Sequence, residues 1–411
     1  MAFNPTGKAP GVYVEDSTPQ GGAIAGVSTS VAGFIGVANG ANMPFLPNGT
    51  KKYELTKSGE PVLITSWVEF RNNFGDFKQP EPNASSTGGE GKDTQPGSEE
   101  ASKYLQHAVY GFFVNGGSKC WVIGQPNWST MSSELDNSLN KLAPIDEIAM
   151  IVVPGLVEQS NQAKVATHCE AMKDRVAILD GKSNGGNLAA KADITDFATN
   201  SYAAIYYPWL QVADPSGNAF LQPPSGHVAG VYARVDATRG VHKAPANEVI
   251  QGVLRVGDSE KSPPVDKTKQ GSLNDAGINI IRDFRGTVKI WGARTLADPD
   301  KEQTYKYLST RRYFNYLRES IEDGTQWVVF EPNAHPLWQR ITRTLEDFLT
   351  REWRNGALFG ATPKEAFYIK CDATTNPKDV RDLGMVVTEI GVSIVKPAEF
   401  VIFNIEHTRG A

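Results

Sequence analysis

The sequence contains few cysteines, no long apolar run and no dense cluster of basic residues. The three cysteines, Cys120, Cys169 and Cys371, lie far apart without a paired spacing, so we expect neither a zinc site nor a disulfide framework and interpret all three as core thiols. No uncharged apolar stretch reaches the ~18 residues of a membrane span. The first residues also lack the charged and apolar regions of a secretory leader, so we expect synthesis in a cytosol and no membrane insertion.

The charge balance and the histidines argue against two further classes of function. The net charge is −5 and the basic residues are not concentrated anywhere, so the sequence predicts no direct nucleic-acid binding. The six histidines are scattered without the spacing that holds a metal on a helix face, so we expect no metal and no cofactor. At 411 residues, the chain is long enough for two or three domains with cores of their own.

Strand and helix patterns alternate between residue 26 and about residue 272. The apolar runs SVAGFIGVA, KCWVIG, IAMIVVPG, RVAILD and AAIYYPWLQV predict strands, and helical spacing predicts helices that begin near residue 99 and span 162–173. Such alternation favours an α/β module with a mostly parallel sheet covered by helices. A polar stretch rich in proline and glycine, at about 79–99, is typical of a mobile surface loop within this module.

The segment after AAIYYPWLQV is rich in residues that restrict or free the backbone. Pro223 and Pro224 fix backbone angles and remove hydrogen-bond donors. Gly226 and Gly230 permit either turns or close contacts between backbones. We therefore expect a rigid region here.

From residue 273 onward, strands and helices follow in a different order. We expect strands at TVKIWGAR and QWVVFEP, helices over 301–322 and 336–354, and three final strands at FYIKCDA, MVVTEIGVSIV and AEFVIFNIEH. The predicted fold class is α/β, α+β overall. It comprises an extended N-terminal arm over 1–25, the central α/β module over 26–272, and a C-terminal α+β domain over 273–411 that ends in a strand arm at about 398–411.

One short motif suggests an enzyme. Residues 181–185, GKSNG, fit the G-x-S-x-G pattern of a hydrolase nucleophile elbow, with Ser183 as the nucleophile after the strand RVAILD. A triad would be completed by an acid, Asp214 or Asp236, and a histidine, His227 or His242. Serine, glycine and asparagine are also ordinary turn residues after a strand. We favour the turn and keep an α/β hydrolase as the alternative.

Both ends of the chain carry short apolar strand patterns. Their residues are Val12, Tyr13 and Val14 near the start, and Phe400, Val401, Ile402, Phe403 and Ile405 near the end. Unpaired strand edges invite pairing with another chain. The last strand is apolar on both faces, as expected of a strand inside a composite sheet. The residues alone leave open whether that sheet belongs to the same molecule or to a neighbour.

The helix predicted at 336–354 has one apolar and one charged face. The apolar face carries Leu337, Ile341, Leu345, Phe348 and Leu349. The charged face carries Arg340, Arg343, Asp347, Arg351 and Arg354. It is either a solvated face, on which Asp347 pairs with Arg343 and Arg351 one turn away, or a stripe that meets a partner.

Several longer segments carry a family resemblance. They are PGVYVED, YYPWL, PPSGHVAGVYARVDATRG, KAPANE, LNDAGINIIRDFRGTVKIWGARTL, FEPNAHPLWQRITRTLEDFL and KPAEFVIFNI. Together they resemble the contractile tail sheath family of phage tails, R-type pyocins and related injection systems. The resemblance covers both ends and most of the second half of the chain, and it does not extend to residues 44–100.

This resemblance implies a structural protein and not an enzyme. Such a subunit polymerises into a helical cylinder around an inner tube and contracts to drive the tube through a target envelope. The resemblance implies that both strand arms pair with neighbouring subunits, that the charged stripe meets the tube, and that baseplate and terminator proteins are further partners. It implies assembly in a bacterial or host cytoplasm, as part of a virion-like or extracellular particle.

The resemblance leaves some alternatives open. A second sheath paralogue could share the cylinder. Two other classes of function also stay open, namely the hydrolase with Ser183 and a carbohydrate- or surface-binding module that remains monomeric.

Overall fold

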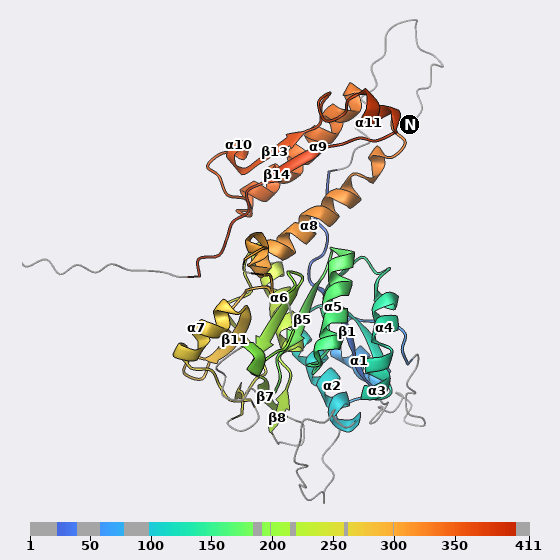
Figure 1. Ribbon diagram of the computed structural model, residues 1–411. Coiled ribbons are helices and arrows are strands. Elements are labelled where there is room, and N and C mark those ends of the chain that lie inside the picture. The colour runs from blue at the N-terminus through green and yellow to red at the C-terminus, as the bar shows by residue number, and fades with distance from the viewer. Residues whose placement is uncertain are drawn as a thin grey trace, which may run out of the picture. The chain divides into compact units, whose positions relative to one another are not determined.

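The computed structural model describes residues 23–38, 58–77, 98–183, 191–197, 199–213, 219–258, 262–298 and 300–399. These residues form two compact units (Figure 1). Within the described chain, the larger unit holds residues 27–317 and 396–399, and the smaller unit holds residues 23–26 and 318–395. The predicted arm residues at 12–14 and 400–405 lie outside the described residues, as does the predicted loop at about 79–99 up to residue 97.

A nine-stranded sheet forms the centre of the larger unit. In spatial order its strands are β2 (Val62–Ile64), β3 (Cys120–Gln125), β1 (Val31–Val37), β4 (Ile148–Val152), β5 (Val176–Asp180), β6 (Ala203–Tyr207), β11 (Ile278–Asp283), β12 (Val288–Ile290) and β9 (Glu248–Val249). The six strands from β3 to β11 run parallel, and antiparallel strands flank them at both edges. The predicted mostly parallel sheet is confirmed.

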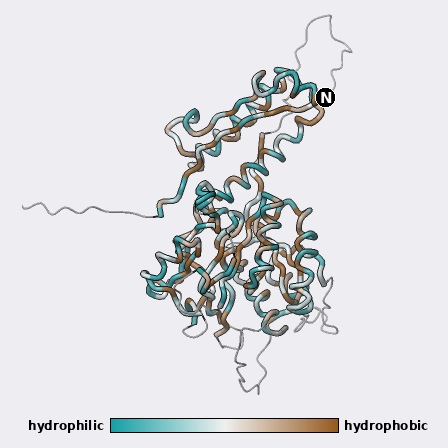
Figure 2. The backbone as a smooth tube through the Cα atoms, viewed as in Figure 1, coloured by the Kyte–Doolittle hydropathy of each residue, from teal (hydrophilic) through white to brown (hydrophobic). Residues whose placement is uncertain are grey.

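Helices cover both faces of this sheet because successive strand residues point to opposite sides. In β5, Val176 and Ile178 join one buried cluster, while Ala177 and Leu179 join the other. The first face is covered by α1 (Trp67–Phe74), α2 (Ser98–Val114) and α6 (Ser225–Arg239), and the second by α3 (Trp128–Ser133), α4 (Leu135–Leu142), α5 (Gln159–Met172) and α7 (Lys267–Asp275). Apolar stretches, brown in Figure 2, run through the interior of this unit.

The segment rich in proline and glycine forms a helix and not a series of turns. A cis Tyr207–Pro208 bond divides the expected strand AAIYYPWLQV, and its second half, β7 (Leu210–Ala213), pairs with β8 (Ala219–Gln222) and β10 (Arg255–Val256). Gly226 and Gly230 then lie inside α6. A Cβ atom at either position would come within 2.4 Å of Ala108 or Phe112 of α2. These glycines therefore allow close packing of two helices, the second of the two uses expected for them.

The larger unit extends past residue 272, because β11 and β12 pair into the nine-stranded sheet. The division between the units falls within α8 (Leu308–Gly324), between residues 317 and 318. Beyond it, the smaller unit contains α9 (His335–Arg354), α10 (Pro363–Ala366), α11 (Lys378–Asp382) and the antiparallel strands β13 (Phe367–Lys370) and β14 (Glu389–Val392). Single 3-10 turns occur at η1 (Lys191–Asp193), η2 (Gln303–Tyr305) and η3 (Gln326–Val328).

The prediction of a strand at QWVVFEP is wrong. Its first residues form the 3-10 turn η3, and Phe330 has a φ of 67°, outside the range of an extended strand. Val329 is 60% exposed and Phe330 fully exposed, so no sheet of the described chain covers this apolar run.

Candidate assembly surfaces

Helix α9 buries one face in the smaller unit and exposes the other. Its buried apolar residues are Leu337, Trp338, Ile341, Leu345, Phe348 and Leu349. They recur at intervals of three and four, which places them on a single stripe of the helix. The predicted amphipathic helix is confirmed. Its other face carries the charged residues and is a candidate contact surface.

Four of the five charged residues predicted on that face are exposed, and three of these four form no ion pair or hydrogen bond within the described ranges. Arg343, Asp347 and Arg354 follow one another at intervals of four and seven residues, so they share a face. Within the described ranges, Asp347 forms no ion pair with Arg343 or Arg351, so the pairs expected one turn away do not form. These three residues are named here the α9 stripe.

The other two arginines have partners inside the smaller unit. The guanidinium of Arg340 lies 4.4 Å from the centre of the Trp327 ring and 3.5 Å from the carboxylate of Glu331. Arg351 donates a hydrogen bond from Nη2 to the carbonyl oxygen of Ile24. Because Ile24 is only 1% exposed, Arg351 helps to hold the root of the N-terminal segment in this unit.

The sheet of the smaller unit has only two strands in the described part of the chain. β13 pairs with β14 from Phe367 opposite Val392 to Lys370 opposite Glu389. Just beyond β14, the backbone N–H of Phe359 donates a hydrogen bond to the carbonyl of Ser393 at 2.7 Å. A two-stranded sheet is marginally stable by itself, and its outer edges offer backbone donors and acceptors to further strands.

A cluster in the larger unit fixes the start of the predicted C-terminal arm, just before its apolar strand pattern. Glu399 accepts hydrogen bonds from Arg294 Nε and Nη2 and from Asn274 Nδ2, all at 2.8 Å, and from the Tyr307 hydroxyl at 3.1 Å. Burial raises the pKa of Glu399, but the bonds from Arg294 and Asn274 outweigh this effect and hold the pKa below its ordinary value. Glu399 is therefore ionised at neutral pH. We name these four residues the Glu399 clamp.

The sequence did not reveal this clamp. Asn274 and Arg294 lie in LNDAGINIIRDFRGTVKIWGARTL, and Glu399 lies in KPAEFVIFNI, so two segments that carry the family resemblance meet here. The only sequence signal is a carboxylate next to an apolar strand pattern, and it does not identify the partner.

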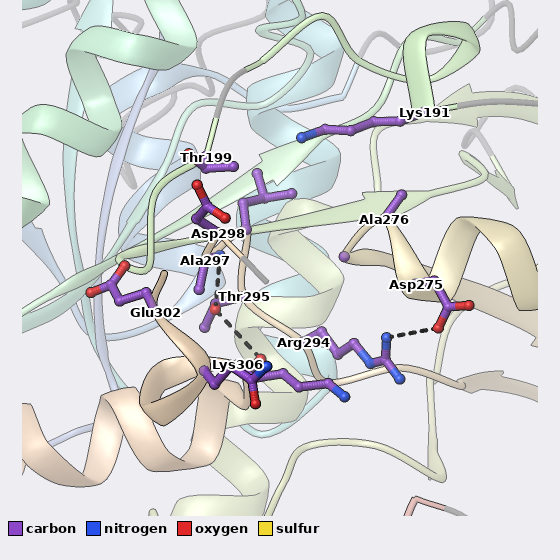
Figure 3. Close-up of a pocket in the computed structure, with 13 residues that line it drawn as sticks. Lys191, Thr199, Asp275, Ala276, Arg294, Thr295, Ala297, Asp298, Glu302 and Lys306 are labelled. Atoms are coloured by element: carbon purple, nitrogen blue, oxygen red, sulfur yellow. Dashed lines mark hydrogen bonds and ion pairs between the residues drawn. The ribbon is translucent and has the colours of Figure 1, made fainter. Parts of the chain in front are cut away.

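A cavity of about 460 Å³ lies beside Arg294 (Figure 3). Much of its charged lining is paired, since Arg294 contacts Asp275 at 3.3 Å and Glu302 contacts Arg311 at 3.4 Å. The described residues that line it include no serine, cysteine or histidine. None of the hydrolase candidates therefore lies in this cavity.

The residues proposed for a catalytic triad are not brought together. Ser183 is half-buried after β5, and no hydrogen bond joins it to a histidine within the described ranges. His227 is buried in α6, His242 lies edge-on to a tyrosine of α8, and Asp236 forms a buried ion pair with an arginine of α8. Asp214 lies outside the described residues. The structure gives no support to the hydrolase.

The sequence also led to expectations about metal sites, membrane spans and core thiols, and the described residues bear on each. Across the described ranges, no group of three or more His, Cys, Asp or Glu residues is placed to hold a metal ion. None of the helices in this part of the chain is both long and apolar enough to cross a membrane. Cys120 and Cys169 are buried as expected, whereas Cys371 is only half-buried and so is not a core thiol.

Comparison with known proteins agrees with the resemblance seen in the sequence. Residues 132–296 match the family of phage tail sheath central domains, and residues 300–408 match that of phage tail sheath C-terminal domains. The tail sheath protein of Burkholderia phage BcepMu is 27% identical over 272 residues, which are 63% of this chain and 55% of that protein. The match therefore spans about half the length of this curated relative.

Solved structures match over a larger part of the chain. The sheath complex of the extracellular contractile injection system PVC, in its contracted state, has a TM-score of 0.73 and 27% identity over 97% of both chains. The helical sheath of the anti-feeding prophage, also contracted, has a TM-score of 0.71 and 26% identity over 97% of this chain and 99% of that one. The chain belongs to the contractile tail sheath family.

Proposed function

We propose that this chain is the sheath subunit of a contractile tail or injection system. It polymerises into a helical cylinder around an inner tube, and contraction of the cylinder drives the tube through a target envelope. The observation that carries this proposal is the match, over nearly the whole chain, to sheath proteins of two contracted particles. The subunit has a structural role and catalyses no reaction.

Strand exchange between subunits holds this cylinder together. The arm residues near positions 12–14 and 400–405 add strands to the β13–β14 sheets of neighbouring copies, whose two-stranded form supports such an addition. Each backbone hydrogen bond contributes about 0.5–1.5 kcal/mol, so several in one strand make a durable join. Head-to-tail contacts that do not close into a ring give a helical array, and contraction is a rigid-body rearrangement of its subunits.

The smaller unit, with the strand arms, faces the inner tube, and most of the larger unit faces outward. The exposed α9 stripe supports this orientation, because complementary charges set register without a deep pocket. Baseplate and terminator proteins are further partners. The particle assembles in a cytoplasm and acts as a virion-like or extracellular device.

Electron microscopy of the purified full-length chain tests the proposal, together with sedimentation. We expect hollow helical cylinders, either of the chain alone or with its tube protein. A chain that stays monomeric at high concentration under both conditions contradicts the proposal. It favours the alternative of a monomeric carbohydrate- or surface-binding module. Turnover of a simple ester substrate favours the hydrolase.

A further inference from the structure

We infer that Glu399 is a positioning residue that fixes the root of the C-terminal arm on the larger unit. The inference rests on the proposed sheath function, because the clamp gains its use when the following residues pair with a neighbouring subunit. It assigns Asn274, Arg294 and Tyr307 the role of a receptor for one carboxylate.

The course of the chain is the first argument. Val395 still belongs to the smaller unit, where its backbone N–H donates to the carbonyl of Ala357 at 3.2 Å. Four residues later, Glu399 is bound to side chains of the larger unit. The next residue, Phe400, begins the apolar strand pattern. The clamp therefore acts on the last residue before the apolar strand pattern of the arm.

The geometry of the clamp fixes both the position and the plane of the Glu399 carboxylate. Arg294 binds both carboxylate oxygens in a bidentate manner, which sets the plane of the carboxylate. Asn274 adds a second donor to one oxygen and Tyr307 adds a second donor to the other. With two donors on each oxygen, the side chain of Glu399 cannot rotate without breaking bonds. The residue before the apolar strand pattern is therefore attached to one site on the larger unit.

The receptor is itself rigid. Arg294 is 5% exposed, and its Nη1 donates to the carbonyl of Asn274 at 2.7 Å. Its backbone N–H donates to the side chain of Asn279 at 2.7 Å, and Asn279 returns a bond to the Arg294 carbonyl at 2.8 Å. Asn279 lies in β11 of the nine-stranded sheet. Force applied to the arm is therefore transmitted through Arg294 and Asn279 to the central sheet of the larger unit.

The test compares two carboxylates in the same unit. Glu399→Ala removes the clamp. Glu147→Ala is the matched control, because Glu147 accepts hydrogen bonds from Lys119 and from Trp121 and is likewise partly exposed, at 32%. Both full-length variants are purified, melted and then assembled into cylinders. We expect similar melting temperatures for the two, normal assembly of Glu147→Ala, and a loss of sedimenting cylinders in Glu399→Ala of about tenfold, equal to 1.4 kcal/mol.

A graded variant guards against a folding defect. Tyr307→Phe removes one of the four bonds and leaves the carboxylate and Arg294 in place, so we expect a smaller loss of cylinders at an unchanged melting temperature. If Glu399→Ala does not fold, Tyr307→Phe decides the matter, and normal assembly of that variant overturns the inference.

The outcomes separate the two proposals. A wild-type chain that builds no cylinders overturns the sheath function and the clamp together. If wild type and Glu399→Ala build equally abundant cylinders of equal length, only the clamp is overturned. Equal losses in Glu399→Ala and Glu147→Ala also overturn it, since the effect would then come from removing any partly buried carboxylate.

Discussion

Asp236 and Arg312 form an almost completely buried ion pair in the larger unit. Their side chains are 4% and 3% exposed, and the two nitrogens of Arg312 lie 2.9 and 2.5 Å from the two oxygens of Asp236. Thr29, just before β1, donates to Asp236 at 2.7 Å and accepts from Arg312 at 2.9 Å. The acid considered for a catalytic triad thus joins α6, α8 and the start of β1.

Replacing Asp236 by alanine should destabilise the larger unit strongly. The change leaves the guanidinium of Arg312 buried without its partner, and breaking a buried pair in this way costs about 3–5 kcal/mol. Denaturant unfolding at pH 7 measures the loss. As a control, the double variant Asp236→Leu with Arg312→Met should lose less of the free energy of unfolding, because apolar groups of similar volume can replace a buried ion pair. A single variant as stable as wild type would show that water reaches the pair.

The stability of the larger unit should fall as the pH drops below 6.5, partly because of His227. Burial in α6, with a smaller effect of His107, lowers the pKa of His227 from 6.5 to about 3. The folded state holds the imidazole of His227 in its neutral form. The contribution of His227 to the free energy of unfolding is therefore complete above pH 6.5 and is lost progressively between pH 6.5 and 3. At pH 5 the loss is about 2 kcal/mol relative to pH 7.5.

The variant His227→Gln isolates this effect. A second group acts in the opposite sense, because burial raises the pKa of Asp180 from 3.8 to about 6, so its neutral form favours the folded state as the pH falls. Unfolding free energies of wild type and variant are compared between pH 7.5 and 4.5. The difference should shrink by about 2 kcal/mol from pH 7.5 to pH 5. A constant difference would show that His227 accepts a proton without leaving its buried site.

Ser183→Ala should leave both folding and assembly unchanged. Ser183 is half-buried in a turn after β5 and has no hydrogen-bonded histidine within the described ranges. Cylinder yield by sedimentation and the melting temperature are the measurements, and we expect the free energy of unfolding to change by less than about 0.5 kcal/mol, as for most substitutions near the surface. Loss of a measurable esterase activity in this variant would restore the hydrolase.

The central module was predictable from the sequence because its signals are local. Parallel strands buried on both faces leave apolar runs such as RVAILD, and β5 forms where that run lies. The apolar stripe of α9 is likewise readable from spacing. The prediction of a strand at QWVVFEP failed because Val329 and Phe330 are exposed in the folded chain, and exposure is a property of the tertiary fold.

The Glu399 clamp and the helix α6 were not predictable for a different reason. Glu399 meets Asn274 across 125 positions of sequence, and no local pattern encodes such a contact. The glycines of α6 lower its intrinsic helix propensity, and only the presence of α2 explains why they lie in a helix. In both cases a partner distant in sequence decides the structure.

Charge reversal on the α9 stripe should weaken binding to the inner tube. Arg343→Glu with Arg354→Glu changes the sign of two exposed positions without touching the partners of Arg340 or Arg351. We expect fewer sheath-on-tube particles, and a loss that is larger at low salt than at high salt, because exposed charges are screened. The control Lys267→Glu with Lys301→Glu makes the same change in net charge on the larger unit. Equal yields of sheath-on-tube particles from the two double variants would mean that the α9 stripe is only a solvated face.

Assembly should fail when either arm is removed, while the nine-stranded sheet stays folded. Deleting residues 1–16 leaves Ile24 and its contact with Arg351 in place, and ending the chain after Glu399 keeps the clamp. The β13–β14 sheets of neighbouring copies then receive no further strands, and we expect monomers with the melting temperature of the full chain. Sedimentation and electron microscopy measure the loss of cylinders.

A proline scan of the C-terminal arm separates strand pairing from apolar contact. Proline at Val401 or Phe403 removes one backbone donor and forces a poor angle in an inner strand, while most of the apolar surface remains. Proline at Thr408, beyond the apolar pattern, is the matched control and should assemble normally. Cylinders of normal length from the Val401 or Phe403 variants would exclude strand exchange through this arm. A broadly unfolded product would instead show that residues 400–405 complete the subunit's own core.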